Sequence, residues 1–276
     1  MVPNKHSTKR TQEKAMDTKR EISPELIRAF IKDYRDKLKN GKVAPCIRAA
    51  GATLPIVWFG DSAAYFRSKR RIVTVALNPS HVEFGANPPR FDQAALAEGN
   101  NVERLRRTLD AYFRTNPYMK WFRHFERVLK MLGASYGDYI GSRDIALHID
   151  MYSAIATVPT WKGLDAGTKS LLRASGVSLF SRLLDELKPH LVLCSVNRDV
   201  REAVLPEFGD KPLRKESEGG NPHATLELFR RKDGVRLLSG TNYRGQPFSR
   251  ITTNWLREHL KNWRVLGGIR LRDKAD

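Results

Sequence analysis

Short apolar runs alternate with amphipathic segments along this chain. Runs rich in branched aliphatic residues predict strands at 54–61, 71–77, 144–150, 191–195, 224–229 and 235–239. Between them, apolar residues recur at helical spacing and predict helices at 24–38, 100–114, 119–132, 168–187, 198–205 and 249–263. Strands that alternate with helices of this length are typical of βαβ units. We therefore expect an α/β fold, a three-layer α/β/α sandwich with a central, mainly parallel sheet.

The N-terminal residues differ in composition from the rest of the chain, which suggests how the chain is organised. Residues 1–20 are polar and basic without an apolar centre, so we interpret them as a disordered basic tail and not as a secretory signal. Residues 21–276 are expected to form a single domain. Its first helix, 24–38, would pack at the domain edge, residues 208–222 would form a surface loop, and Ser249 would cap the last helix.

The predicted strand 71–77 ends abruptly at Asn78-Pro79-Ser80. Pro79 cannot continue a strand ladder, so Asn78 is held at the carboxyl end of a buried strand, where open α/β sheets bind their ligands. A lone Asn-Pro is more often a simple turn. However, two further polar clusters also follow predicted strands, namely His148 with Asp150, and residues 241–246. In a parallel sheet these ends converge on one edge.

Charge is the strongest compositional feature. The chain of 276 residues carries 49 Lys and Arg against 30 Asp and Glu, a net charge of +19. Residues 1–20 hold six basic and two acidic side chains, so +15 remains on the body. A polyanionic partner is the natural inference, and nucleic acid is the commonest one. A small substrate needs no such field, which argues against a nucleoside hydrolase.

Two cysteines, Cys46 and Cys194, provide neither a disulfide framework nor a four-cysteine metal or iron–sulfur site. No apolar run approaches the roughly 18 residues of a membrane span. We therefore expect a cytoplasmic protein, a monomer without cofactor, metal or membrane contact.

The strand-end motifs resemble those of the uracil-DNA glycosylase superfamily. Residues 76–80, Ala-Leu-Asn-Pro-Ser, resemble the Gly-x-Asn-Pro-Gly motif of its mismatch-specific and single-strand-selective branches. Residues 148–150 fall where the family has its base-reading strand end, and 240–242, Gly-Thr-Asn, fall where it usually has His-Pro-Ser. The resemblance covers roughly residues 54–263. It implies a monofunctional DNA glycosylase that flips out a base and hydrolyses the N-glycosidic bond.

In that interpretation Asn78 holds the attacking water. Glu83 offers a carboxylate that orients water or stabilises the cationic sugar, unless it is a solvated loop residue. The usual His of the last motif is missing, and His148 is the best replacement as a donor to the base O2, although its position in a strand favours a packed residue over a catalytic one. The resemblance adds three base-binding candidates around them, which are Ser80, Phe84 and Asn242.

Asp150 stands where the family usually has Asn. An amide offers uracil both a donor for O4 and an acceptor for N3–H, whereas an ionised carboxylate only accepts. Cytosine carries an N4 amino donor in place of O4. Asp150 therefore favours a cytosine-type base, unless it merely caps a turn. Because excising ordinary cytosine would destroy the host genome, we expect a modified cytosine such as hydroxymethylcytosine or its glucosylated forms in phage DNA, hence a role in anti-phage defence.

Reaching a base in a duplex requires flipping it out, and a side chain commonly fills the gap. The loop before the last helix, with Tyr243, Arg244 and Phe248, falls where the family carries such a wedge. The expected DNA-binding residues are Arg71, His81, Tyr243, Arg244, Gln246 and Arg250. Two alternatives remain open: a uracil or mismatch repair glycosylase, and a non-catalytic nucleic-acid-binding module with the same fold.

Overall fold

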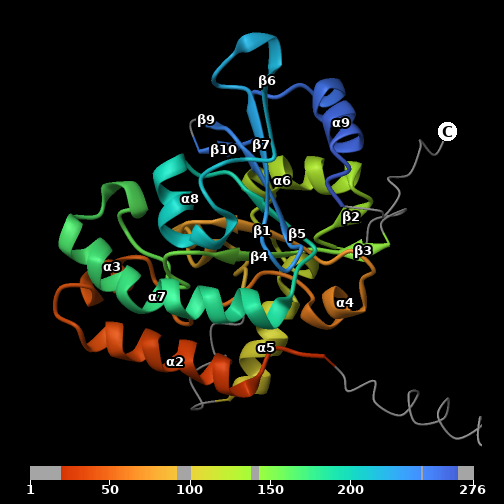
Figure 1. Cartoon of the computed structure of the whole chain (residues 1–276). Helices are drawn as coiled ribbons and strands as arrows, with labels where there is room; N and C mark the ends of the chain where they lie inside the picture. Colours follow the sequence, from red (N-terminus) through yellow and green to blue (C-terminus); the bar gives the residue numbers. More distant parts are fainter. Residues whose placement is uncertain (1–19, 92–100, 138–142, 244, 267–276) are drawn as a thin grey trace, which may run out of the picture.

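A six-stranded sheet forms the centre of the structure (Figure 1). The structure is a computed structural model that describes residues 20–91, 101–137, 143–243 and 245–266. The strand order is β4-β1-β5-β8-β7-β6, with β1 Ile72–Ala76, β4 Leu147–Asp150, β5 Leu191–Cys194, β6 Arg214–Ser217, β7 Thr225–Arg230 and β8 Arg236–Gly240. The first four strands in this order are parallel, whereas β7 and β6 continue antiparallel. The predicted α/β class with a mainly parallel sheet is confirmed.

Two small sheets flank the central one. β2 (Ala134–Ser135) pairs with β3 (Asp144–Ile145) in parallel. Directly after β8, the chain forms a tight hairpin from β9 (Asn242–Tyr243) and β10 (Gln246–Pro247). This hairpin therefore starts at the carboxyl end of a parallel strand.

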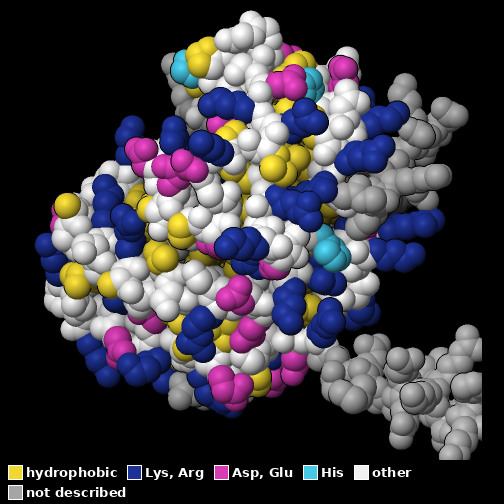
Figure 2. All heavy atoms as spheres, in the orientation of Figure 1, with side chains coloured by type: hydrophobic (Ala, Val, Ile, Leu, Met, Phe, Trp, Pro, Cys, Tyr) yellow, Lys and Arg dark blue, Asp and Glu magenta, His cyan; other side chains and the backbone are white. Residues whose placement is uncertain are grey.

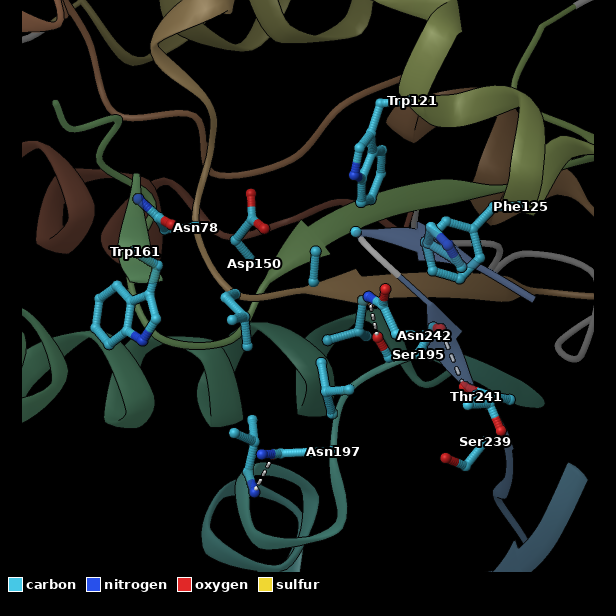
Figure 3. A pocket seen from close by; sticks show the side chains of 18 of the residues that line it. Asn78, Trp121, Phe125, Asp150, Trp161, Ser195, Asn197, Ser239, Thr241 and Asn242 are labelled. Carbon is cyan, nitrogen blue, oxygen red and sulfur yellow. Dashed lines mark hydrogen bonds between the residues drawn. The ribbon is translucent and has the colours of Figure 1, made fainter. Parts of the chain in front are cut away.

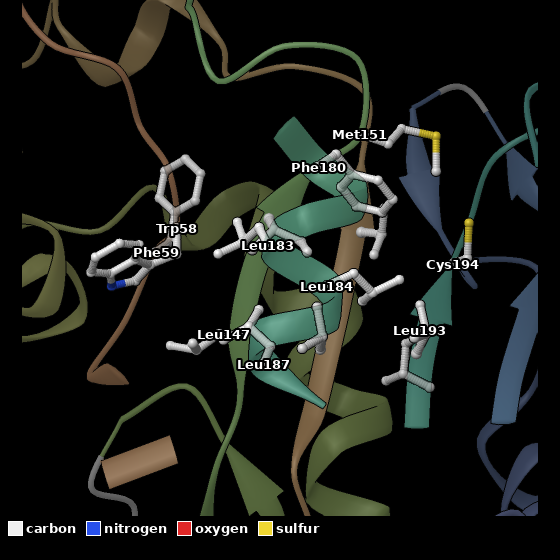
Figure 4. Close-up of a cluster of buried hydrophobic side chains, with 14 of the residues drawn as sticks. Trp58, Phe59, Leu147, Met151, Phe180, Leu183, Leu184, Leu187, Leu193 and Cys194 are labelled. Carbon is white, nitrogen blue, oxygen red and sulfur yellow. The ribbon is translucent and has the colours of Figure 1, made fainter. Parts of the chain in front are cut away.

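Helices cover both faces of the sheet. α7 (Ala166–Leu187) packs its Leu183, Leu184 and Leu187 among apolar strand side chains (Figure 4), and α2 (Pro24–Lys39) lies outside α7 (Figure 1). α6 (Met119–Met131) lies on the other face, where its aromatic rings contact His148 of β4. The other α-helices of the described residues are α3 (Ala44–Ala49), α4 (Ser62–Arg67), α5 (Val102–Asp110), α8 (Arg198–Val204) and α9 (Thr253–Asn262).

The alternation of side chains along β4 decides which residues face the site. His148 contacts the rings of α6, so Asp150, two residues later, lies on the same face. Leu147 and Ile149 point to the α7 face and are fully buried. The parallel register pairs Ala76 of β1 with Asp150. The carboxyl ends of β1 and β4 are therefore level with each other.

The predicted strand at 54–61 is wrong. This segment is buried and extended, but it forms only a single antiparallel bridge, between Phe59 and His148. Pro55 removes one backbone donor, and the chain instead covers the outer edge of β4. Trp58 is held by a hydrogen bond of 2.9 Å from its indole nitrogen to Asp110.

Two boundaries near the C-terminus also differ from expectation. α9 begins at Thr253 after Thr252, because residues 248–251 form a separate turn in which Phe248 has a φ of 57°. The predicted loop 208–222 contains β6, an exposed and charged strand that pairs with β7 alone. Polar edge strands of this kind lack the apolar alternation that sequence patterns detect.

A close backbone crossing ties the loop after β4 to α7. A Cβ at Gly176 would lie 1.9 Å from the carbonyl oxygen of Tyr152. We expect Gly176→Ala to lower the free energy of unfolding by about 2–3 kcal/mol despite the better helix propensity of alanine, because backbone atoms must move. Gly41→Ala, with no neighbour within 4 Å, is the control. Denaturant unfolding of both variants measures the difference, and equal stabilities would contradict the crossing.

Candidate active site

A cavity of about 850 Å³ opens at the carboxyl ends of the parallel strands. Each strand contributes polar residues from its end: Asn78 after β1, Asp150 ending β4, Ser195 after β5 and Thr241 after β8 (Figure 3). This is the edge at which open α/β sheets bind ligands, and the volume lies in the range of small-molecule sites. The expected convergence of the three polar clusters is therefore seen, with Asn78 and Asp150 lining one cavity.

Asn78 is held by the loop that follows β4. Its Nδ2 donates hydrogen bonds to Thr157 Oγ1 at 3.2 Å and to the Ile155 carbonyl at 3.4 Å. The amide oxygen turns toward the side on which Asp150 lies (Figure 3). Ser80 also lines the cavity. Its backbone forms an isolated parallel β-bridge with Thr157, and its Oγ accepts a hydrogen bond from the Val82 amide at 3.3 Å. These bonds fix the amide so that its oxygen can accept a hydrogen bond from a water in the cavity.

Glu83 lines the cavity but is only 4% exposed. Tyr112 donates a 2.6 Å hydrogen bond to Oε2, and Arg90 lies 3.8 Å from the same oxygen. Burial raises the pKa of Glu83 to about 7, and the charge of Asp150 adds to this, while Tyr112 and Arg90 oppose it. Glu83 is therefore not a solvated loop residue. Its carboxylate is suited to accept a proton near neutral pH.

The carboxyl group of Asp150 is buried without a partner. Its side chain is 2% exposed, and within the described part of the chain neither oxygen has a hydrogen-bond partner. The nearest cationic candidate, His148 Nε2, lies 3.7 Å from Oδ1, too far for a hydrogen bond. Burial raises the pKa of Asp150, and His148 opposes this shift. A buried carboxyl group without a hydrogen-bond partner lowers the stability of the free protein, so its presence indicates a ligand that supplies the missing partner.

His148 does not line the cavity, so the structure does not bring it to the site as a catalytic residue. It is 2% exposed beneath the cavity floor, among the rings of Phe59, Trp121 and Phe122. Its Nδ1 lies 2.8 Å from Thr74 Oγ1. His148 is therefore a packed residue that supports Asp150 from below, because the strand alternation points both side chains to one face.

Aromatic side chains form two walls of the cavity. Trp121 and Phe125 of α6 lie on one side of Asp150 in the view of Figure 3, and Trp161 lies on the other. Trp161 stacks on Tyr152 with ring centroids 4.7 Å apart. The sequence pattern marks the α6 rings as core, and Phe125 is indeed buried, yet both also face the cavity. Flat aromatic walls suit a planar ligand such as a nucleobase.

The β9–β10 hairpin forms part of the rim. Asn242 lines the cavity and donates from Nδ2 to the Ser195 carbonyl at 3.0 Å. Phe248 is fully buried against Phe125 and cannot serve as a wedge. A Cβ at Gly240 would lie 2.2 Å from the Phe248 ring, so this glycine permits the ring to anchor the hairpin. Phe248 is thus a support for the rim.

The other predicted residues are distributed as follows. Phe84 is 7% exposed, packs against Phe91 and does not line the cavity, so it is not placed to bind a base. His81 is exposed beside the site. Tyr243 and Gln246 belong to the hairpin, and the Arg250 guanidinium lies 3.8 Å over the Tyr243 ring. Arg244 lies outside the described residues.

Arg71 lies at the opposite end of β1 from the cavity. Its Nε donates to the Lys188 carbonyl at 3.0 Å, and its backbone amide donates to His190 Nδ1 at 3.1 Å. Five strand residues separate it from the site, which is roughly 16 Å at the rise of a strand. The expectation that Arg71 borders the site is therefore corrected. It lines a second cavity of about 610 Å³ at the amino ends of the strands.

Three cationic residues at the cavity were not singled out from the sequence: Lys162, Arg198 and Lys215. Two have acidic neighbours, because Arg198 pairs with Glu202 at 2.5 Å and Lys215 with Glu227 at 2.9 Å. Figure 2 shows Lys and Arg side chains spread over the face of the molecule that is turned to the viewer, with acidic ones between them. Charge alone could not single them out in a chain so rich in Lys and Arg.

Compared with family models and with curated proteins, the chain matches none of them. Among the described residues, His, Cys, Asp and Glu nowhere gather in a group of three that could hold a metal ion. In the same part of the chain, no helix combines the length and apolar character that crossing a bilayer requires.

Proposed function

We propose that this protein is a DNA glycosylase that excises a modified, cytosine-type pyrimidine by hydrolysing its N-glycosidic bond. The observation that carries the proposal is the buried, unpartnered carboxyl of Asp150, which shares one aromatic-walled cavity with Asn78 and Glu83. A flipped base would stack between the aromatic walls with its polar edge at Asp150. The cavity exceeds the volume of one pyrimidine, which leaves room for a substituent such as hydroxymethyl or a sugar.

The chemistry needs three functions that these residues can supply. Hydrolysis passes through an oxocarbenium-like sugar, so a water must be held at C1′ and the departing base must be stabilised. Asn78 would accept a hydrogen bond from that water, and Glu83 would take its proton. Asp150 would hold the base by its N4 amino group. The three polar clusters contain no lysine, and the proposal assigns no Schiff-base role to Lys162 or Lys215, which line the cavity outside those clusters.

The proposal is tested by the bases that the protein releases. Purified protein is incubated with genomic DNAs that carry cytosine, hydroxymethylcytosine, glucosylated hydroxymethylcytosine or uracil, and free bases are identified by mass spectrometry. We expect a modified cytosine to be released together with an equal number of abasic sites. Release of uracil alone would favour repair of uracil or mismatches. DNA binding without any release would favour the non-catalytic module, and either outcome would contradict the proposal.

Binding to DNA is expected to weaken steeply with salt. Each phosphate neutralised by a basic side chain adds roughly 0.9 to the slope of log K against log salt concentration for duplex DNA. Lys162 is exposed at the cavity, so Lys162→Ala should reduce that slope by about 0.9. Lys32→Ala on α2, a helix that lies outside α7, should leave it unchanged. Fluorescence anisotropy at several salt concentrations measures this, and a flat response would argue against a DNA substrate.

A further inference from the structure

The way in which Asp150 binds a base depends on whether its carboxyl group is ionised or protonated. An ionised carboxylate with a 2% exposed side chain and no hydrogen-bond donor would be an uncompensated buried charge. The charged and titratable groups around it are His148, Glu83 with its neighbours Tyr112 and Arg90, and four further residues that line the cavity, Lys162, Arg198, Lys215 and Glu227. Of these, only His148 lies within ion-pair distance of an Asp150 oxygen in the described structure. The surroundings therefore favour the neutral carboxylic acid.

A neutral carboxylic acid matches cytosine better than a carboxylate does. Cytosine presents the N4 amino donor next to the N3 lone pair, which is an acceptor. The acid offers a carbonyl oxygen to N4–H and an O–H to N3, so both edge atoms are satisfied at once. A carboxylate would accept from N4 but place its second oxygen against the N3 lone pair. The same edge is present in any cytosine substituted at C5.

We propose that Asp150 binds the base as a carboxylic acid and transfers its proton to N3 while the C1′–N1 bond breaks. This inference rests on the proposed glycosylase function. The bond's electron pair passes to the base, which leaves as a neutral molecule because N3 has gained the proton. Water adds to C1′ and gives a proton to Glu83. Asp150 ends ionised and Glu83 protonated, and exchange with solvent restores both.

The two carboxyl groups then form an acid–base pair with one proton between them. The charge of Asp150 helps to raise the pKa of Glu83, so the pair titrates together and its two pKa values belong to the pair. The rate is expected to be bell-shaped in pH, with a limb at low pH where both groups are protonated and a limb at high pH where both are ionised. The active form holds the proton on Asp150.

Asp150→Asn separates binding from proton transfer. The amide keeps a carbonyl for N4–H and an N–H for N3, but it has no proton to give. On a modified cytosine, the single-turnover rate at saturating protein should fall roughly 10²–10⁴-fold, with the high-pH limb lost and DNA affinity nearly unchanged. The acid or the amide can also offer its donor to O4 and its carbonyl to N3–H of 5-fluorouracil, whose anion leaves readily without a proton, so on this base the same variant should lose less than about tenfold. A purely structural role would lower both rates equally and would overturn the inference.

A change in the substrate provides the second test and leaves the protein intact. In 3-deazacytosine a C–H replaces N3, so the base cannot accept the proton. Wild-type protein should excise it as slowly as Asp150→Asn excises the parent base, and combining the two changes should cost little more. Equal excision of the deaza and parent bases would overturn the proton transfer while leaving the glycosylase function intact. If wild-type protein releases no base at all, the proposed function itself fails.

Discussion

Replacing Asn78 by alanine is expected to slow single-turnover base release by roughly 10²–10³-fold while DNA affinity changes less than about threefold, because a bond to water at C1′ matters only during the reaction. The structure places the amide oxygen toward Asp150 and ties the amide nitrogen to Thr157 and Ile155. Alanine removes the acceptor for the water. Quenched-flow assays on DNA with the preferred base measure the rate.

A second variant separates the two ends of the Asn78 side chain. Asn78→Asp keeps an oxygen for the water but loses the donor to Thr157 and Ile155. We expect it to retain more activity than Asn78→Ala. Asn101→Ala removes an exposed asparagine that caps α5, and it is expected to release bases at the wild-type rate. If Asn78→Ala is as active as Asn101→Ala, Asn78 does not hold the water.

Glu83→Gln is expected to lower the rate by roughly 10²–10⁴-fold and to abolish the low-pH limb of the rate profile. The physical reason is the buried position of the carboxyl, which raises its pKa from 4.5 to about 7. Only the ionised form accepts a proton from water, so wild-type activity should rise as the pH increases through about 7. Glutamine has the same shape but cannot accept that proton.

The same shift affects the pH dependence of stability. Because the folded-state pKa is raised, the folded protein binds more protons than the unfolded chain between pH 4.5 and about 7, and stability falls as the pH rises through this window. The full cost above pH 7 is about 3 kcal/mol at 1.36 kcal/mol per unit. Glu83→Gln should therefore be more stable than wild type at pH 8 and lose that advantage at pH 5. Glu25→Gln, on exposed α2 surface, is the control in thermal unfolding. A pH-independent difference would contradict the raised pKa.

The strand ends were predictable from the sequence because they depend on local rules. A branched aliphatic run followed by Asn-Pro gives the end of β1. The segment 144–150, predicted as one strand and divided in the structure into β3 and β4, gives the end of β4. Parallel pairing then brings Asn78 and Asp150 to one edge whatever the details of packing. The fold class and the meeting of these two side chains follow from that alone.

The contacts that give the site its chemistry were not predictable in the same way. The bond from Tyr112 to Glu83 joins residues 29 positions apart, and no sequence period encodes it. The sequence predicts that the aromatic rings of α6 lie in the core, because amphipathic spacing does not distinguish a core position from a cavity wall. Arg71 was misplaced for the converse reason, since adjacency in sequence to β1 puts it at the wrong end of the strand.

The most direct test of the central claim is a crystal structure of the wild-type protein with DNA that carries a 2′-fluorinated, non-hydrolysable modified cytidine. We expect the base to be flipped into the cavity between Trp161 and the α6 rings, with N3 and N4 within hydrogen-bond distance of the Asp150 carboxyl and C1′ facing Asn78 and Glu83. A base that remains stacked in the DNA, or one that binds away from Asp150, would contradict it.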